Sequence, residues 1–126
     1  MDKHARRGLI ITILFAILLL VLSIIPGDLT STPGNFYFEG IDKVMHAIMY
    51  GIFSVLVTNV YLALYQARFW PLVFLVLTTW CYSVVMEILQ LYIVQTRSGE
   101  LLDALANLAG IVFGTLIFVA YRKIRS

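Results

Sequence analysis

Residues 8–25 read GLIITILFAILLLVLSII and contain no charged side chain. An α-helix rises about 1.5 Å per residue, so roughly 20 apolar residues are needed to cross a bilayer. Three more stretches reach about this length, at positions 44–64, 69–94 and 101–121. The chain is 61% hydrophobic and only 13% charged, unlike an ordinary soluble domain. The sequence therefore predicts an all-α membrane protein, with residues 1–126 forming one domain of four transmembrane helices.

The segments between these stretches predict how the helices are arranged. Residues 66–68 and 95–100 form short connections, so consecutive helices are expected to be antiparallel neighbours in a bundle. The first connection, residues 26–40, is longer and contains two prolines and three glycines, which is typical of a loop. Pro71 falls in the first turn of the third helix, where its missing N–H costs nothing.

The basic residues predict how the helices are oriented in the membrane. If the N-terminus is cytoplasmic, seven of the nine basic residues lie inside and only Lys43 and Arg97 lie outside, as the positive-inside rule favours. Both termini are therefore predicted to be cytoplasmic. The basic N-terminus resembles the start of a signal peptide, but no small-x-small cleavage motif follows Ser23, so we expect an uncleaved anchor. The net charge of +2 is too small to suggest nucleic-acid binding.

Polar side chains gather toward the outer ends of the second, third and fourth predicted helices. Ionisable groups inside a bilayer are costly, so those that persist serve pairing, transport or chemistry. At the rise of an α-helix, Tyr50, Glu87 and Asn107 each lie roughly 9 Å below the outer boundary. The full set comprises Asp42, Lys43, His46, Tyr50, Glu87, Gln90, Arg97, Asp103 and Asn107. We expect these residues to form one site that faces the extracytoplasmic side.

Helical spacing arranges part of this set in stripes. Three polar residues of the second helix, from Asp42 to Tyr50, are four positions apart and so share one face. On the fourth helix, the stripe that begins at Asp103 also contains Gly110 and Gly114. These glycines form a G-x-x-x-G pair, which lets two helices approach closely. We therefore expect packing through this pair to bring the polar groups of three helices into contact.

The order and spacing of these residues resemble those of a known family. The pattern runs Asp42-Lys43-x-x-His46-x-x-x-Tyr50, Glu87-x-x-Gln90, Arg97, then Asp103-x-x-x-Asn107-x-x-Gly110-x-x-x-Gly114. It resembles the VanZ-like family of small bacterial integral membrane proteins, whose namesake is associated with resistance to the lipoglycopeptide teicoplanin. The resemblance implies a multi-pass protein of the bacterial cytoplasmic membrane, with a role in the cell envelope and a link to antibiotic resistance.

One hypothesis is a binding or remodelling protein. In this interpretation Lys43, His46 and Arg97 hold the anionic headgroup of a lipid or of a lipid-linked envelope intermediate, since helix starts also favour anions. Further binding contacts would come from the remaining uncharged polar residues, namely Tyr50, Gln90 and Asn107. The expected partners are membrane lipids, and a homo-oligomer is compatible with the small size of the chain.

A second hypothesis is an intramembrane enzyme. His46, oriented by Asp42, would act as general base, Glu87 as acid or second base, and Arg97 would stabilise negative charge. The reaction would be hydrolysis or transfer on a lipid headgroup, with Asp103 as a further catalytic candidate. A divalent metal held by the same histidine and carboxylates is a variant, because these are permissible ligands. No tight ligand spacing demands a metal, so no metal or other cofactor is predicted.

A third hypothesis is purely structural. The polar residues could link the helices at their outer ends without binding any ligand, and the carboxylates at the helix starts could serve as caps. A transporter is disfavoured, because the chain has few helices and no inverted repeat. Whether the protein is an enzyme is left open by the sequence.

Overall fold

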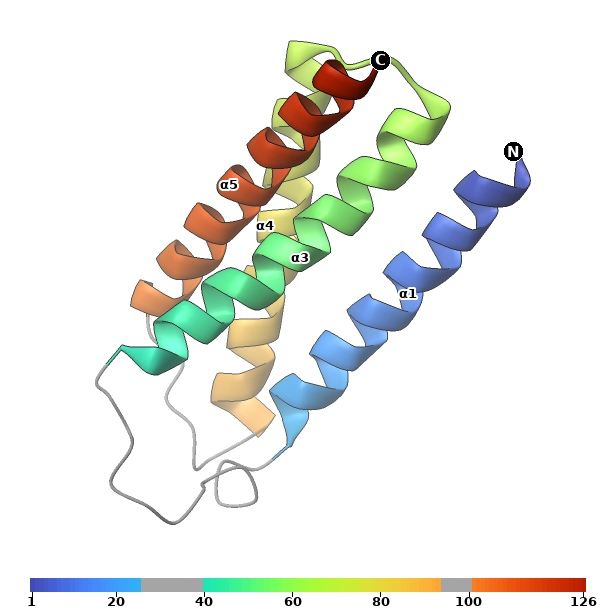
Figure 1. Ribbon diagram of the computed structural model, residues 1–126. Helices are drawn as coiled ribbons and strands as arrows, with labels where there is room; N and C mark the ends of the chain where they lie inside the picture. Colours follow the sequence, from blue (N-terminus) through green and yellow to red (C-terminus); the bar gives the residue numbers. More distant parts are fainter. Residues whose placement is uncertain (26–39, 94–100) are drawn as a thin grey trace.

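The structure is a computed structural model that describes residues 1–25, 40–93 and 101–126. Four α-helices account for nearly all of these residues (Figure 1). They are α1 (Lys3–Ile24), α3 (Ile41–Leu64), α4 (Phe69–Ile93) and α5 (Leu101–Arg125). Each helix is long and apolar enough to cross a membrane. The prediction of an all-α protein with four candidate membrane spans is therefore confirmed.

The helices begin where local capping allows, rather than where the apolar stretches begin. α1 starts five residues earlier than predicted, because the Asp2 carboxylate caps it by accepting a hydrogen bond from the Ala5 N–H at 2.7 Å. This hydrogen bond holds the pKa of Asp2 below its usual value. α3 starts at Ile41 because Gly40 before it adopts a φ of 103°, a left-handed conformation that favours glycine. The hydropathy pattern detects neither cap.

Consecutive helices run in opposite directions, as the short connections predicted. α1 and α4 run one way, α3 and α5 run the other way, and both chain termini lie at the same end of the bundle (Figure 1). The most extensive contact, however, joins α3 to α5, which are parallel and not consecutive. α3 and α4 follow each other in sequence but make the least contact of the contacting pairs. The connection lengths thus predict direction but not the closest neighbour.

Glycines allow the backbones of α3 and α5 to touch. A Cβ atom added to Gly110 would overlap the carbonyl oxygen of Ala47, and one added to Gly114 would come within 2.5 Å of the Gly51 oxygen. A Cβ at Gly51 would lie 3.3 Å from the Gly110 oxygen. The structure therefore places the G-x-x-x-G pair of α5 at the contact with α3, where only a hydrogen atom fits.

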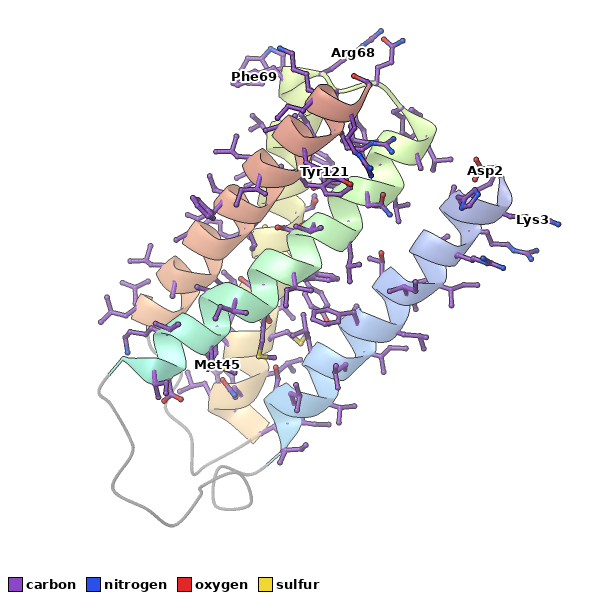
Figure 2. All side chains as sticks on the ribbon, viewed as in Figure 1. Asp2, Lys3, Met45, Arg68, Phe69 and Tyr121 are labelled. Carbon is purple, nitrogen blue, oxygen red and sulfur yellow. The ribbon has the colours of Figure 1, made fainter. Side chains whose placement is uncertain are left out.

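The bundle carries apolar side chains on its outside. Leu14 is 60% exposed and Phe113 is 68% exposed, and apolar sticks project outward along each helix in Figure 2. A small apolar core lies between the helices and contains Leu19, Tyr50, Phe53 and Ile111. The buried polar residues are Ser54, Thr58, Thr79, Ser83, Glu87, Gln90, Asp103, Asn107 and Thr115. Apolar groups outside and polar groups inside suit a hydrocarbon solvent, so this is a multi-pass membrane protein.

Two hydrogen bonds from aromatic residues fasten α4 to its neighbours. The Tyr82 hydroxyl donates to the Ala16 carbonyl of α1 at 2.6 Å, and the Trp80 indole N–H donates to the Ala104 carbonyl of α5 at 3.0 Å. Such polar contacts stabilise helix association in hydrocarbon by about 0.6 kcal/mol on average. α4 is therefore positioned against α1 and α5, although it contacts α3 only weakly.

Candidate polar site

The centre of the site is a histidine and a glutamate from different helices. His46 of α3 and Glu87 of α4 approach until His46 Nδ1 lies 3.1 Å from Glu87 Oε1. The His46 side chain is 25% exposed and the Glu87 side chain is 10% exposed. A carboxylate at this depth needs a partner, and His46 lies close enough to serve as one. The histidine thus links the buried carboxylate to the more open side of the cluster.

An asparagine from a third helix joins this pair. Asn107 of α5 is completely buried, and its Nδ2 lies 3.4 Å from Glu87 Oε1, so it donates a long hydrogen bond to that oxygen. Glu87 and Asn107 had been expected at the same depth from the rise of their helices, and their contact agrees with that estimate. The Glu87 carboxylate is therefore oriented from two sides.

A lysine and an aspartate lie beside these residues. Lys43 of α3 places its Nζ 3.7 Å from Oδ1 of Asp103 on α5. The Lys43 side chain is 35% exposed, whereas that of Asp103 is only 12% exposed. At 3.7 Å this is an ion pair without a close hydrogen bond.

Side-chain atoms from three helices thus converge in one small volume. One ligand atom each from His46, Glu87 and Asp103 lies within 4.8 Å of the other two. We call these three residues together with Asn107 the polar cluster. It contains two carboxylates and an imidazole, the side chains that carry proton transfer and that bind divalent cations in proteins.

The glycine contact explains why these residues meet. Ala47 of α3 touches Gly110 of α5, and the two helices run in parallel. One turn before Ala47 lies Lys43, and two turns before Gly110 lies Asp103, on the same helix faces as the contact. The backbone contact therefore brings the side chains of Lys43 and Asp103 close enough to form their ion pair. The close approach of α3 and α5 also leaves His46 and Asn107 facing Glu87.

The remaining predicted site residues have different environments. Asp42 is exposed in the first turn of α3, and the carboxylate that contacts His46 is Glu87 rather than Asp42. Tyr50 belongs to the apolar core, with its ring edge-on to Phe53 at 6.5 Å between centroids. Gln90 is buried one turn beyond Glu87. Arg97 lies outside the residues that the structure describes.

Sequence reasoning missed a second set of buried polar residues. Ser54 and Thr58 continue the inward face of α3 beyond Tyr50, and Thr79 and Ser83 precede Glu87 on the inward face of α4. Their hydroxyls bond mainly to carbonyls of their own helix, such as Ser54 Oγ to Gly51 O at 2.8 Å. Their spacing of four was the available signal for a polar inward face.

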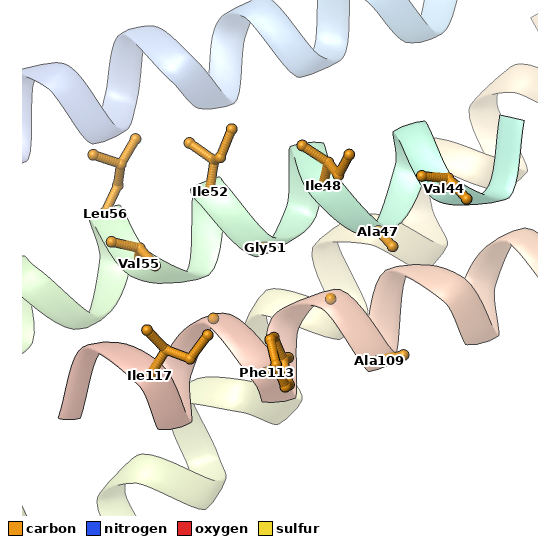
Figure 3. A pocket seen from close by; sticks show the side chains of 12 residues that line it. Val44, Ala47, Ile48, Gly51, Ile52, Val55, Leu56, Ala109, Phe113 and Ile117 are labelled. Atoms are coloured by element: carbon orange, nitrogen blue, oxygen red, sulfur yellow. The ribbon is translucent and has the colours of Figure 1, made fainter. Parts of the chain in front are cut away.

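An apolar groove lies next to the polar cluster. It has a volume of about 630 Å³ and follows the contact between α3 and α5 on the outside of the bundle (Figure 3). Its floor is formed by Gly51, Gly110 and Gly114, and its walls include Val44, Ile48, Ile52, Ala109, Phe113 and Ile117. We call it the α3–α5 groove. Lys43, which forms the ion pair with Asp103, lies next to the groove residue Val44 and one turn before Ala47 along α3.

The opposite end of the bundle is basic. A hollow of about 1190 Å³ there is lined by Arg68, Arg122, Lys123 and Arg125 together with several aromatic residues. Arg122 donates a hydrogen bond to the Leu62 carbonyl at the end of α3. Both termini lie at this end, and Figure 2 shows Arg68 and Lys3 there. The polar cluster and the basic hollow thus occupy opposite ends of the molecule.

Comparisons with known proteins do not assign the chain to a family. No protein-family model, curated protein or solved structure matches the chain. The resemblance to the VanZ-like family therefore stays a prediction.

Proposed function

We propose that this protein binds the polar headgroup of a lipid, or of a lipid-linked cell-envelope intermediate, at the extracytoplasmic leaflet. The observation that carries the proposal is the apolar α3–α5 groove, together with the ion pair of Lys43 and Asp103, in which Lys43 lies one helical turn before the groove residue Ala47. A groove lined by apolar side chains suits an acyl or isoprenoid chain, and the polar groups beside it suit a headgroup. The ligand class is therefore an amphiphile with an anionic or otherwise polar head.

The placement at the extracytoplasmic leaflet rests on the distribution of charge. The basic hollow and both termini share one end of the bundle, and the positive-inside rule assigns such an end to the cytoplasm. The polar cluster then faces the outside, where envelope precursors are used. The resemblance to the VanZ-like family extends this proposal to the bacterial cytoplasmic membrane. It also suggests that the protein alters the access of a lipoglycopeptide such as teicoplanin to its target.

A second candidate function is chemistry on the same headgroup. It is favoured by the contact of His46 with Glu87, because an imidazole held by a carboxylate can act as a general base. Asn107 would keep Glu87 in place while His46, the more exposed partner, removes a proton from an attacking water or hydroxyl. The product would be a hydrolysed or transferred headgroup. Binding and chemistry would share one site.

The proposal is tested by native mass spectrometry of the protein extracted from membranes in a mild detergent. We expect an amphiphile to be retained by the wild type and lost from Ala109→Phe, which fills the α3–α5 groove. Ala120→Phe adds the same ring at an exposed alanine of α5 outside the groove and should retain the ligand. Equal retention by both variants, or no retained amphiphile in the wild type, would exclude the groove as its binding site.

A further inference from the structure

Two buried acceptor atoms of the polar cluster have no hydrogen-bond partner among the residues that the structure describes. Glu87 is 92% buried and its Oε2 has no hydrogen-bond partner within the described ranges, and the same holds for Oδ1 of the fully buried Asn107. An unsatisfied buried acceptor costs about 1–3 kcal/mol, so two of them on neighbouring side chains indicate that a ligand belongs here. The two side chains contact each other through Asn107 Nδ2 and Glu87 Oε1, so these two acceptors belong to one cluster.

The imidazole does not satisfy these acceptors. His46 Nδ1 lies 3.1 Å from Glu87 Oε1, but it is not in line for a well-formed hydrogen bond. A cation bound by both atoms would satisfy this nitrogen and this oxygen together. Two ligands of a tetrahedral metal with bonds of 2.0–2.1 Å are about 3.3 Å apart, close to the separation observed here.

The charge balance also favours a cation. Glu87 and Asp103 bring two carboxylates into a volume from which water is largely excluded, and Lys43 offers one positive charge beside them. Two carboxylates would repel an anionic headgroup that arrived beside the α3–α5 groove. A divalent cation bound between them would reverse the sign of the local field and attract that headgroup.

We propose that His46, Glu87 and Asp103 bind one divalent transition-metal ion, with the side-chain oxygen of Asn107 as a fourth ligand. Imidazole, carboxylate and amide oxygen form a mixed set that suits Zn²⁺ or Mn²⁺, whereas Mg²⁺ prefers oxygen ligands alone. The three ligand atoms are within 4.8 Å of one another, so binding requires their separations to shorten by up to about 1.5 Å to reach bonding geometry. The proposal that an ion binds here depends only on the positions of these ligand atoms. Only the proposed role of the ion, which is to attract a headgroup, depends on the proposed function.

The test is a Zn²⁺ titration of purified protein stripped with a chelator, in a Cys81→Ser background that removes the exposed thiol. Isothermal calorimetry and elemental analysis should find one Zn²⁺ per chain. His46→Gln should weaken binding at least about tenfold, the lower limit for disturbing a metal site. His4→Gln is the matched control, because His4 is exposed on α1 at the other end of the bundle, and it should bind as the parent does.

Asp103→Asn provides a second variant if His46→Gln does not fold, and thermal unfolding provides a second readout. Zn²⁺ should raise the unfolding temperature of the parent and of His4→Gln, but not that of Asp103→Asn, because only a folded site binds the ion. Absence of saturable Zn²⁺ and Mn²⁺ binding, or equal binding by His46→Gln and His4→Gln, would overturn the metal site. Retention of an amphiphile in the same samples separates the two proposals: amphiphile without metal refutes only the metal site, and metal without amphiphile refutes only headgroup binding.

Discussion

The contact between His46 Nδ1 and Glu87 Oε1, at 3.1 Å, crosses the interface between α3 and α4. These two helices make the least contact of the contacting pairs in the bundle. A polar pair at a weak interface contributes a large share of the specific contacts there.

Replacing Glu87 should separate a structural role from a chemical one. Glu87→Ala leaves the buried Asn107 amide without its acceptor and removes the carboxylate beside His46, so we expect a loss of about 1–3 kcal/mol in unfolding free energy. Glu87→Gln keeps an acceptor of the same shape and should accumulate nearly as the wild type does, while losing any headgroup binding or chemistry. Thermal unfolding in detergent and protein abundance in membranes are the measurements. Equal loss of abundance in both variants would favour the purely structural hypothesis.

A methyl group at the α3–α5 contact should force the two helices apart. Gly110→Ala would place its Cβ against the Ala47 carbonyl, and overpacking of this kind costs about 1–3 kcal/mol. Gly51→Ala meets the Gly110 oxygen at 3.3 Å, so it should be the milder change. Comparing their unfolding temperatures tests this order. If Gly110→Ala were as stable as the wild type, the backbone contact would not exist in the folded protein.

The hydrogen bond from Tyr82 to Ala16 should measurably hold α1 to the bundle. Tyr82→Phe removes the hydroxyl and keeps the ring, so we expect a loss of about 0.6 kcal/mol, up to about 1.7 kcal/mol. Tyr92→Phe makes the same chemical change on α4 at a side chain that is 78% exposed, and it should have no effect. Unfolding curves of the two variants in one detergent give the comparison. Indistinguishable curves would mean that the hydroxyl adds nothing to the association of α1 and α4.

The predicted orientation can be measured with single cysteines in the Cys81→Ser background. Asp42→Cys lies exposed at the end with the polar cluster, and Gln66→Cys lies exposed at the end with the basic hollow. In intact cells, a membrane-impermeant maleimide should label Asp42→Cys and should label Gln66→Cys only after permeabilisation, as the positive-inside rule requires. The opposite pattern would place both termini outside and move the site to the cytoplasmic leaflet.

The four helices could be predicted from the sequence because apolar length alone defines a membrane span. The common depth of Glu87 and Asn107 could be predicted too, because every helix has the same rise per residue. The parallel contact of α3 and α5 could not, since connection lengths say nothing about helices that are not consecutive. The sequence also could not predict that Glu87, rather than Asp42, contacts His46. The rotation of each helix about its own axis decides this, and packing sets that rotation.

The backbone contact between Ala47 and Gly110 determines the depth at which the polar cluster lies along α3 and α5. Carbonyl and glycine fix the register of α3 against α5, so the separation of Lys43 from Asp103 does not depend on the side chains that face the lipid. Exchanges among apolar residues at those outward positions therefore leave the register of the two helices unchanged. The lipid-facing surface and the level of the polar cluster are thus set by different residues.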